Sequence, residues 1–137
     1  MARAYKFTQA QNKPTYYSDI DDSFSLVPTT GNLSVVTNEN SVYQSILRIV
    51  LTGKYERLYN PDFGSKVPSL MFELSDPLTA KLIETEIENT VRTFEPRIDK
   101  FTLEIELRGH DVLVRGIFTL VNISKDFPFT FSVKRVR

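Results

Sequence analysis

The sequence predicts an α+β fold in which two main helices pack on one face of a small, mostly antiparallel sheet. Apolar residues recur at helical spacing between residues 38 and 94, and they alternate with polar residues from residue 98 onward. All the helical segments precede the strands, so the sheet is expected to form from hairpins. The 137 residues suffice for one domain with its own core. We expect an extended N-terminal arm over residues 1–37 and a single α+β domain over residues 38–137.

The expected arm is polar and irregular. Pro14, Pro28 and Gly31 interrupt its short apolar pieces, and its charge changes from basic before residue 14 to acidic over residues 19–22. This pattern suits contact with a partner or with the domain's own flank. The alternative is a partly ordered terminus without a role.

A first amphipathic helix is expected from residue 38 to about residue 52. Its apolar face, at positions i, i+4, i+7 and i+8, consists of Val42, Ile46, Ile49 and Val50. Asn38 or Asn40 can cap its start, because a short polar side chain there accepts a hydrogen bond from a free backbone N–H. Gly53 is expected to end the helix in the left-handed conformation, which glycine adopts without strain.

An ordered loop is expected after this helix, because the segment is rich in turn-forming and aromatic residues; a short helix over residues 67–72 follows it. The candidate site residues in the loop are Gly53, Glu56, Arg57, Pro61, Phe63 and Gly64. The glycines of the chain are scattered singly, so none of them forms a phosphate-binding loop.

A second helix is expected from residue 76 to residue 94. Asp76 as N-cap, followed by Pro77 at the first helical position, is a strong start signal, because proline there gives up an N–H that has no partner. Pro96 ends the helix, since the residue before a proline is disfavoured in the α region. The expected inward stripe consists of Leu78, Leu82, Ile83, Ile87, Val91 and Phe94.

The rest of the chain predicts three strands. Residues 101–108 and 112–121 form a hairpin around a turn at Gly109 and His110, because apolar and polar residues alternate on both sides of it. Gly116 is expected at a bulge or at a close backbone approach. The last strand carries Pro128, which cannot donate to a ladder and so belongs on an edge.

The composition excludes several functional classes. Without cysteine there is no disulfide scaffold, thiolate zinc site or cysteine nucleophile. The 17 basic and 17 acidic residues balance, unlike those of proteins held to nucleic acid by many phosphate contacts. No apolar run is long enough for a membrane span, and no secretory signal follows the basic N-terminal residues. His110 is the only histidine, so we expect no metal and no cofactor.

Paired carboxylates are harder to exclude. Glycoside hydrolysis needs two of them at a suitable separation, one with a raised pKa. Four acidic residues lie near aromatic residues in the sequence, namely Glu56, Asp62, Glu73 and Glu95. Any chain with 17 acidic residues offers such pairs, so we expect that this protein is not an enzyme.

The corner after the second helix points to protein recognition. Pro96 stiffens it, Arg97 can make two parallel bonds to a carboxylate, and Glu95 stands where the helix dipole disfavours an anion. An unfavourable charge at a rigid, exposed corner indicates a docking site. The alternative is an internal Glu–Arg clamp that only fixes the corner.

The aromatic last strand is a second candidate interface. Its alternating apolar residues are Phe127, Phe129, Phe131 and Val133. A long apolar edge strand invites aggregation unless another strand covers it. The functional interpretation is strand addition by a partner chain; the alternative is pairing inside the domain.

Several separated segments carry a family resemblance: YSDID (17–21), GKYER (53–57), NPDFG (60–64), LMFE (70–73) and FEPRI (94–98). In this order they resemble the small baseplate wedge protein of contractile-tailed phages, a family shared with the baseplate component of type VI secretion systems. The resemblance covers nearly the whole chain. It implies a sheath-initiator-like fold, similar to the part of the sheath subunit that exchanges strands with its neighbours.

The resemblance implies a structural role in the virion, in the tail baseplate, after assembly in the host cytoplasm. Glu95, Pro96 and Arg97 would dock on the core bundle of wedge proteins, and the last strand would offer its edge to strands of the tail sheath protein and so initiate sheath polymerisation. The tail tube is a further candidate partner. Members of the family have also been labelled lysozymes, so the enzymatic alternative is an acid lysozyme-like glycoside hydrolase. A stress-response anti-adaptor of related fold is a third alternative.

Overall fold

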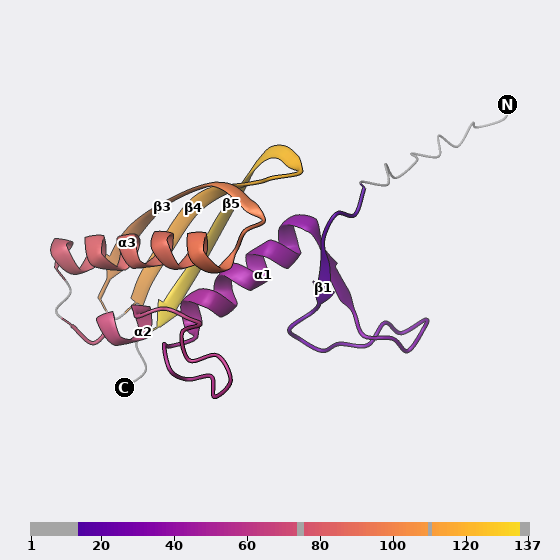
Figure 1. Ribbon diagram of the computed structural model, residues 1–137, viewed down its shortest axis with the longest axis horizontal. Helices are drawn as coiled ribbons and strands as arrows, with labels where there is room; N and C mark the ends of the chain where they lie inside the picture. The colour runs from indigo at the N-terminus through magenta and orange to yellow at the C-terminus, as the bar shows by residue number, and fades with distance from the viewer. Residues whose placement is uncertain (1–13, 74–75, 110, 135–137) are drawn as a thin grey trace, which may run out of the picture.

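The computed structural model describes residues 14–73, 76–109 and 111–134. Its elements, in chain order, are β1 (Ser18–Ile20), β2 (Val35–Thr37), α1 (Asn38–Leu51), α2 (Val67–Leu70), α3 (Pro77–Phe94), β3 (Ile98–Arg108), β4 (Asp111–Leu120) and β5 (Ile123–Lys134). Figure 1 shows α1 and α3 against the sheet of β3, β4 and β5, with the β1–β2 hairpin beside α1.

The main sheet is antiparallel and has the strand order β3-β4-β5. The inward side chains of all three strands form one core cluster with those of α1, α2 and α3. The predicted α+β class, with helices on one face of an antiparallel sheet, is confirmed. Pro128 lies on an outer strand, as its missing N–H requires. His110, expected in the β3–β4 turn, lies outside the described residues.

The helices bury the expected stripes except for two leucines of α3. The predicted face of α1 is buried, and in α3 the side chains of Ile83, Ile87 and Val91 are fully buried. Each fully buried aliphatic side chain contributes roughly 1.5–3 kcal/mol to folding. Leu78 and Leu82, however, are 68% and 46% exposed, so their assignment to the stripe was wrong.

The stripe of α3 starts instead at a threonine. Thr79 and Thr90 are buried on the same face as Ile83, Ile87 and Val91, because residues three or four positions apart share a helix face. Leu82 precedes Ile83 by one residue, which turns it about 100° away from the core. The Asp76 cap was predicted correctly, since its Oδ1 accepts from the Thr79 N–H at 2.7 Å.

Both predicted ends of α1 were wrong in detail. Thr37 is the N-cap residue, and Asn38 has a left-handed φ of 47° while its side chain binds the arm. At the other end Thr52 is extended, and its hydroxyl donates to the Arg48 carbonyl at 2.6 Å. At Gly53 a Cβ would lie 2.8 Å from the Glu56 carboxylate, so a larger residue there would displace that side chain.

Phenylalanine rings fill the space between the sheet and the helices. The Phe129 ring stacks on Phe101 with 5.5 Å between centroids and lies 6.0 Å from Phe118. Gly116 leaves room for it, because a Cβ there would approach the Phe129 ring to 2.7 Å and the Thr102 carbonyl oxygen to 2.3 Å. The close approach expected at Gly116 is confirmed; the register shifts of the sheet lie elsewhere, at Ile98/Lys100 and Thr119/Leu120.

Gly116→Ala is expected to destabilise the domain by about 1–3 kcal/mol, the usual cost of overpacking a core, because its methyl group meets backbone as well as the Phe129 ring. Chemical denaturation followed by circular dichroism measures the change. Ser132→Ala, at an exposed position of β5, is the control and should stay within about 0.5 kcal/mol of the parent. Equal stability of the two variants would contradict the packing role of Gly116.

Candidate protein-docking surfaces

The corner between α3 and β3 is built around a buried ion pair. The Arg97 guanidinium donates from Nε to Glu95 Oε1 and from Nη2 to Glu95 Oε2, both at 2.6 Å. Its Nη1 donates to the Ser41 hydroxyl of α1 at 3.2 Å. The planar guanidinium thus holds the carboxylate by two parallel bonds and ties the corner to a second helix.

The Glu95 carboxylate is only 3% exposed, so the expectation of an unfavourable charge at an exposed corner was wrong for this residue. Burial alone would raise its pKa, but the hydrogen bonds from Arg97 and Ser45 and the Arg97 charge outweigh burial and lower the pKa. Pro96 is exposed and Arg97 is partly exposed. The surface of the corner is therefore made by Pro96 and the outer side of Arg97.

The N-terminal arm reaches this corner through one tyrosine. The Arg97 guanidinium lies 5.5 Å from the centroid of the Tyr17 ring, within the range of a cation–π contact. The Tyr17 hydroxyl accepts from Asn122 in the β4–β5 turn at 2.8 Å. The Asn38 side chain accepts from the Tyr16 and Tyr17 N–H groups at 2.9 and 3.3 Å. The link from Tyr17 to Arg97 was not predicted from the sequence.

The described part of the arm forms the β1–β2 hairpin, which an ion-pair cluster holds against α1. Arg48 donates from Nη1 to Asp19 at 2.8 Å and from Nε to Asp22 at 2.8 Å, and Nη2 also binds Asp22. The hydrogen bond from Arg48 lowers the pKa of Asp19 against the opposing effect of burial. The acidic stretch therefore contacts the domain's own flank, one of the two expected targets.

The loop between α1 and α2 is ordered by its own backbone and side chains. Glu56 accepts from the Gly53 N–H at 3.0 Å, and the Tyr55 N–H donates to the Pro61 carbonyl at 2.9 Å. Gly64 has a φ of 109°, and a Cβ there would lie 2.4 Å from the Thr52 carbonyl oxygen.

Two of the predicted loop residues join the loop to α3. The Arg57 guanidinium lies 3.9 Å from the centroid of the Phe63 ring, and that ring packs on Phe94 with 5.2 Å between centroids. The structure thus brings Arg57 and Phe63 together with α3, whereas Glu56, Gly53 and Gly64 shape the turn itself.

The tip of this loop carries exposed apolar side chains that sequence reasoning missed. Tyr55, Leu58 and Tyr59 are 78%, 94% and 102% exposed. The loop projects away from the sheet and lies below α1 in the view of Figure 1. Between the loop and α2 lies an open hollow of about 660 Å³. Aromatic residues inside a turn-rich segment were the available signal, because clustered exposed apolar side chains often mark an interaction surface.

The four predicted residues of β5 lie on an edge strand of the sheet, but their side chains do not point out from that edge. Phe127, Phe129, Phe131 and Val133 are all buried and face the helices, because alternate residues of a strand share a face. What β5 exposes on its outer side is backbone. Here α1 reaches the strand, since the Tyr43 hydroxyl donates to the Thr130 carbonyl at 3.2 Å.

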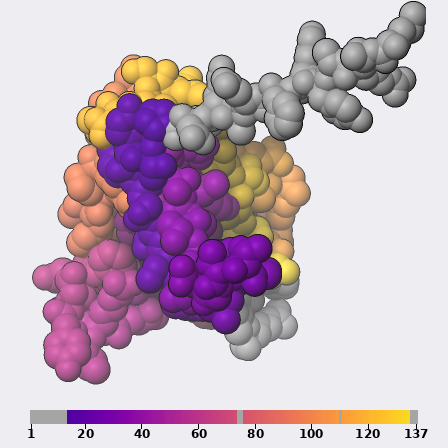
Figure 2. Space-filling model, turned by 90° about the vertical axis from the view of Figure 1, so that its right-hand side faces the viewer, coloured from indigo at the N-terminus to yellow at the C-terminus, as the bar shows by residue number. Residues whose placement is uncertain are grey.

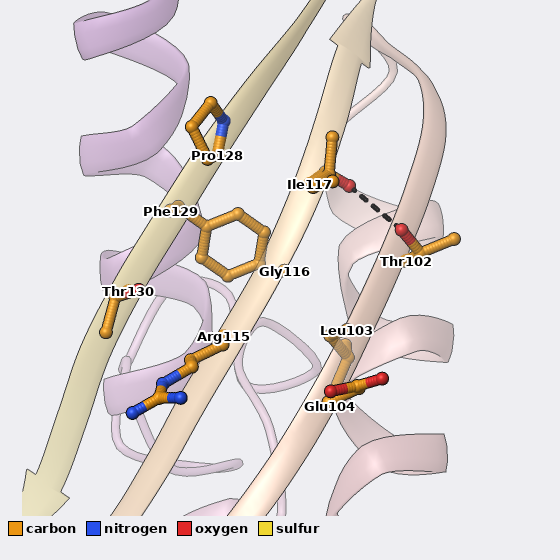
Figure 3. Close-up of a pocket in the computed structure, with 9 residues that line it drawn as sticks. All are labelled: Thr102, Leu103, Glu104, Arg115, Gly116, Ile117, Pro128, Phe129 and Thr130. Atoms are coloured by element: carbon orange, nitrogen blue, oxygen red, sulfur yellow. Dashed lines mark hydrogen bonds between the residues drawn. The ribbon is translucent and has the colours of Figure 1, made fainter.

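The outer face of the sheet carries a shallow hollow above Gly116. Figure 3 shows Thr102, Glu104, Arg115 and Ile117 around it, with Thr130 on the neighbouring strand. The hollow measures about 430 Å³ and is open to solvent. It holds one acidic and one basic side chain and lacks an enclosed apolar pocket of the kind that binds small molecules.

The described residues contain no group of three or more His, Cys, Asp or Glu side chains placed to hold a metal ion. Hydrogen bonds to the charged form lower the pKa of five carboxyl groups among the same residues, namely Asp19, Asp21, Asp76, Glu95 and Glu106. Within the part of the chain that the structure covers, no helix combines the length and apolarity of a membrane span.

Comparison with known proteins decides the family. The family model described as baseplate wedge protein gp25 matches residues 36–118. Baseplate wedge protein gp25 of Enterobacteria phage T4 is 37% identical over 89 residues, which cover 65% of this chain and 67% of that protein. The chain belongs to the baseplate wedge protein gp25 family. The predicted resemblance is therefore confirmed, and the gp25 match extends from β2 through both main helices into β4.

Solved structures share the gp25 fold. A protein described as a candidate tail lysozyme from Geobacter sulfurreducens matches with a TM-score of 0.66 and 24% identity, over 72% of this chain and 92% of its own. A chain of the anti-feeding prophage baseplate matches with a TM-score of 0.56 and 16% identity, over 88% and 87%. A chain of the type VI secretion baseplate complex has values of 0.54 and 16%, over 69% and 93%. Family membership makes this chain a structural component of a baseplate.

The ion pair at the corner predicts how stability depends on pH. The folded-state pKa of Glu95 is lowered from about 4.5, so its stabilisation is fully present above that value and is lost as the pH falls through the folded-state pKa. Thermal unfolding between pH 7 and pH 3 should show a smaller acid loss in the double variant Glu95→Gln/Arg97→Met. Parallel pH profiles of parent and double variant would contradict this prediction.

The single variant Arg97→Ala serves as the comparison at pH 7. It leaves the buried carboxylate without its partner and should cost about 3 kcal/mol, whereas removing both charges costs less.

Proposed function

We propose that this baseplate wedge protein is a connector that docks on the core bundle of wedge proteins through the surface of the Glu95–Pro96–Arg97 corner and initiates the tail sheath through the edge of β5. The observation that carries the docking part is the buried Glu95–Arg97 pair, which fixes an exposed proline between two helices and a strand. The protein would act in the tail baseplate of the virion, after assembly in the host cytoplasm. The tail tube is a further candidate neighbour.

The corner suits docking because it is rigid before any partner arrives. Arg97 is bound by Glu95 on one side, by Ser41 beside it and by the Tyr17 ring across it. An interface that is ordered in the free protein loses little conformational entropy on binding. Glu95 acts in this proposal as a positioning residue, and the contacts to the partner come from Pro96 and the open side of Arg97.

The edge of β5 can accept a strand only over its C-terminal half. The Thr130 carbonyl binds Tyr43 of α1, so Thr130 directs its backbone groups away from β4. Every second residue of a strand directs its backbone groups the same way, so Ser132 also faces outward. Pro128 offers no N–H, and Tyr43 covers Thr130. We place the incoming sheath strand along Phe131–Val133 and Lys134, where main-chain groups supply affinity.

The enzymatic alternative has one observation in its favour, the likeness to a protein described as a candidate tail lysozyme. A glycoside hydrolase needs a carboxylic acid whose pKa is raised. Glu95 has a lowered pKa, and Glu56 is bonded to the backbone of its own loop. We therefore infer that the chain acts without catalysis. The purified protein should release no reducing sugar from cell-wall peptidoglycan.

Pro96→Glu tests the docking role without touching the buried pair. The new charge lies on the exposed side of the corner and should lower incorporation into purified wedge complexes that lack this chain by roughly tenfold or more, about 1.4 kcal/mol per factor of ten. Sedimentation of the reconstituted wedge measures incorporation. Thr85→Glu, an exposed change in the middle of α3, is the control and should incorporate normally. Normal incorporation of folded Pro96→Glu would exclude docking at this corner.

Ser132→Pro tests the strand-addition role. It removes one outward N–H from β5 and keeps the β4–β5 ladder, so the domain should fold and join the wedge while sheath polymerisation fails. Ser132→Ala, which keeps that N–H, is the matched control. Electron microscopy of particles that carry each variant provides the readout. Sheaths of normal length on Ser132→Pro particles would refute sheath initiation at this edge.

A further inference from the structure

The outer face of the β1–β2 hairpin is an exposed apolar surface. Five side chains make it up, with exposed fractions of 40% to 68%: Ile20, Phe24, Leu26, Leu33 and Val35. Figure 2 shows the hairpin, in indigo and purple, raised on the face of the molecule where it crosses α1. Soluble proteins rarely expose contiguous apolar patches without a binding function.

Cross-strand pairing places four of these residues on one side of the hairpin. Ile20 is paired with Val35, and Leu26 is paired with Leu33. The alternate residues turn the other way, since Asp19 binds Arg48 of α1 and Ser34 binds Asp21. The hairpin thus has a polar inner face, which is used inside the chain, and an apolar outer face, which the described residues leave uncovered.

The outer face is also free of charge. Residues 23–37 contain no Asp, Glu, Lys or Arg, although a quarter of the whole chain is charged. Proteins normally protect exposed strands from pairing with other chains by placing charges on them. An outer face without charged side chains matches a partner surface that is itself uncharged and apolar.

The hairpin is ordered before it meets a partner. Its strands are joined beyond β1 and β2 by the bonds from Ser34 N to Ser25 O at 2.8 Å and from Val27 N to Asn32 O at 2.7 Å. Phe24 has a φ of 50°, a left-handed conformation that costs a residue with a side chain on the order of 1 kcal/mol. Its ring is nevertheless 68% exposed, so the strain does not serve the core of this chain.

We propose that the outer face of the β1–β2 hairpin is a second docking surface, which binds an uncharged apolar surface of a different baseplate protein. The largest apolar patch on a typical monomer covers on the order of 300–600 Å². Two copies paired through a patch of that size would bury less than the roughly 800 Å² per partner of a standard interface. The surface therefore works as part of a larger contact, beside the Tyr17–Arg97 corner to which the arm is attached. This inference rests on the baseplate role.

The test uses the full chain and purified wedge complexes that lack it. The variant Leu26→Lys/Val35→Lys places two charges on the outer face, and Thr30→Lys/Asn32→Lys places two charges at the exposed hairpin tip as a matched control. Circular dichroism verifies that both variants fold like the parent. The proposal predicts that the outer-face variant is incorporated roughly tenfold less well or worse than the control, a loss of about 1.4 kcal/mol or more.

A further variant keeps the outer face and loosens its support. Arg48→Met removes the ion pairs to Asp19 and Asp22, so the hairpin loses its fixed orientation and incorporation should fall although every outer-face residue is unchanged. Normal incorporation of the outer-face variant would overturn the proposal. A parent chain that dimerises in sedimentation equilibrium, and loses only this dimer in the outer-face variant, would also overturn it, because the occupant would then be a second copy.

The same assay separates this proposal from docking at the corner. If Pro96→Glu is incorporated normally and the outer-face variant is not, the hairpin surface stands and corner docking fails. If the outer-face variant is incorporated normally and Pro96→Glu is not, the proposal for the hairpin surface is overturned and docking at the corner stands.

Discussion

The buried ion pair between Glu95 and Arg97 is the interaction on which the arrangement of the whole chain depends. It forms where α3 ends and β3 begins, and Arg97 extends it to Ser41 of α1 and to the Tyr17 ring of the arm. Helix, sheet and arm therefore meet at one guanidinium group. Because a buried carboxylate needs its partner, removing either group is expected to lower the stability of the domain as well as the proposed docking.

The other two candidate interfaces, the hairpin face and the β5 edge, are held in place relative to this corner through α1. The arm hairpin is held on α1 by Arg48, so its apolar outer face has a fixed position relative to Pro96. On the other side of α1, Tyr43 limits the part of the β5 edge that another strand can use. The proposed role as a connector requires such a rigid frame, since several small contacts would have to be made together.

The sequence was sufficient to predict the elements whose periodicity is strong, namely α1, α3 and the three long strands, together with the Asp76 cap and the edge position of Pro128. It failed at places decided by contacts distant in the chain. Asn38 binds the arm and does not cap its helix, and Glu95 is buried where Arg97 meets Ser41 of α1 and the Tyr17 ring of the arm. The family motifs located the corner and the loop, but the burial of Phe127, Phe129 and Phe131 and the link from Tyr17 depend on how the sheet and arm pack in three dimensions.

Hydrogen exchange of the chain, free and within the assembled baseplate, tests the central claim most directly. The account predicts added protection in the assembled state at Arg97 and Ile98, at Ser132 and Lys134, and along the β1–β2 hairpin, while amides on the exposed face of α3 stay unchanged. Unchanged exchange at Arg97 and Ile98, with new protection confined to α3, would contradict the view that the Glu95–Arg97 corner is the point of attachment.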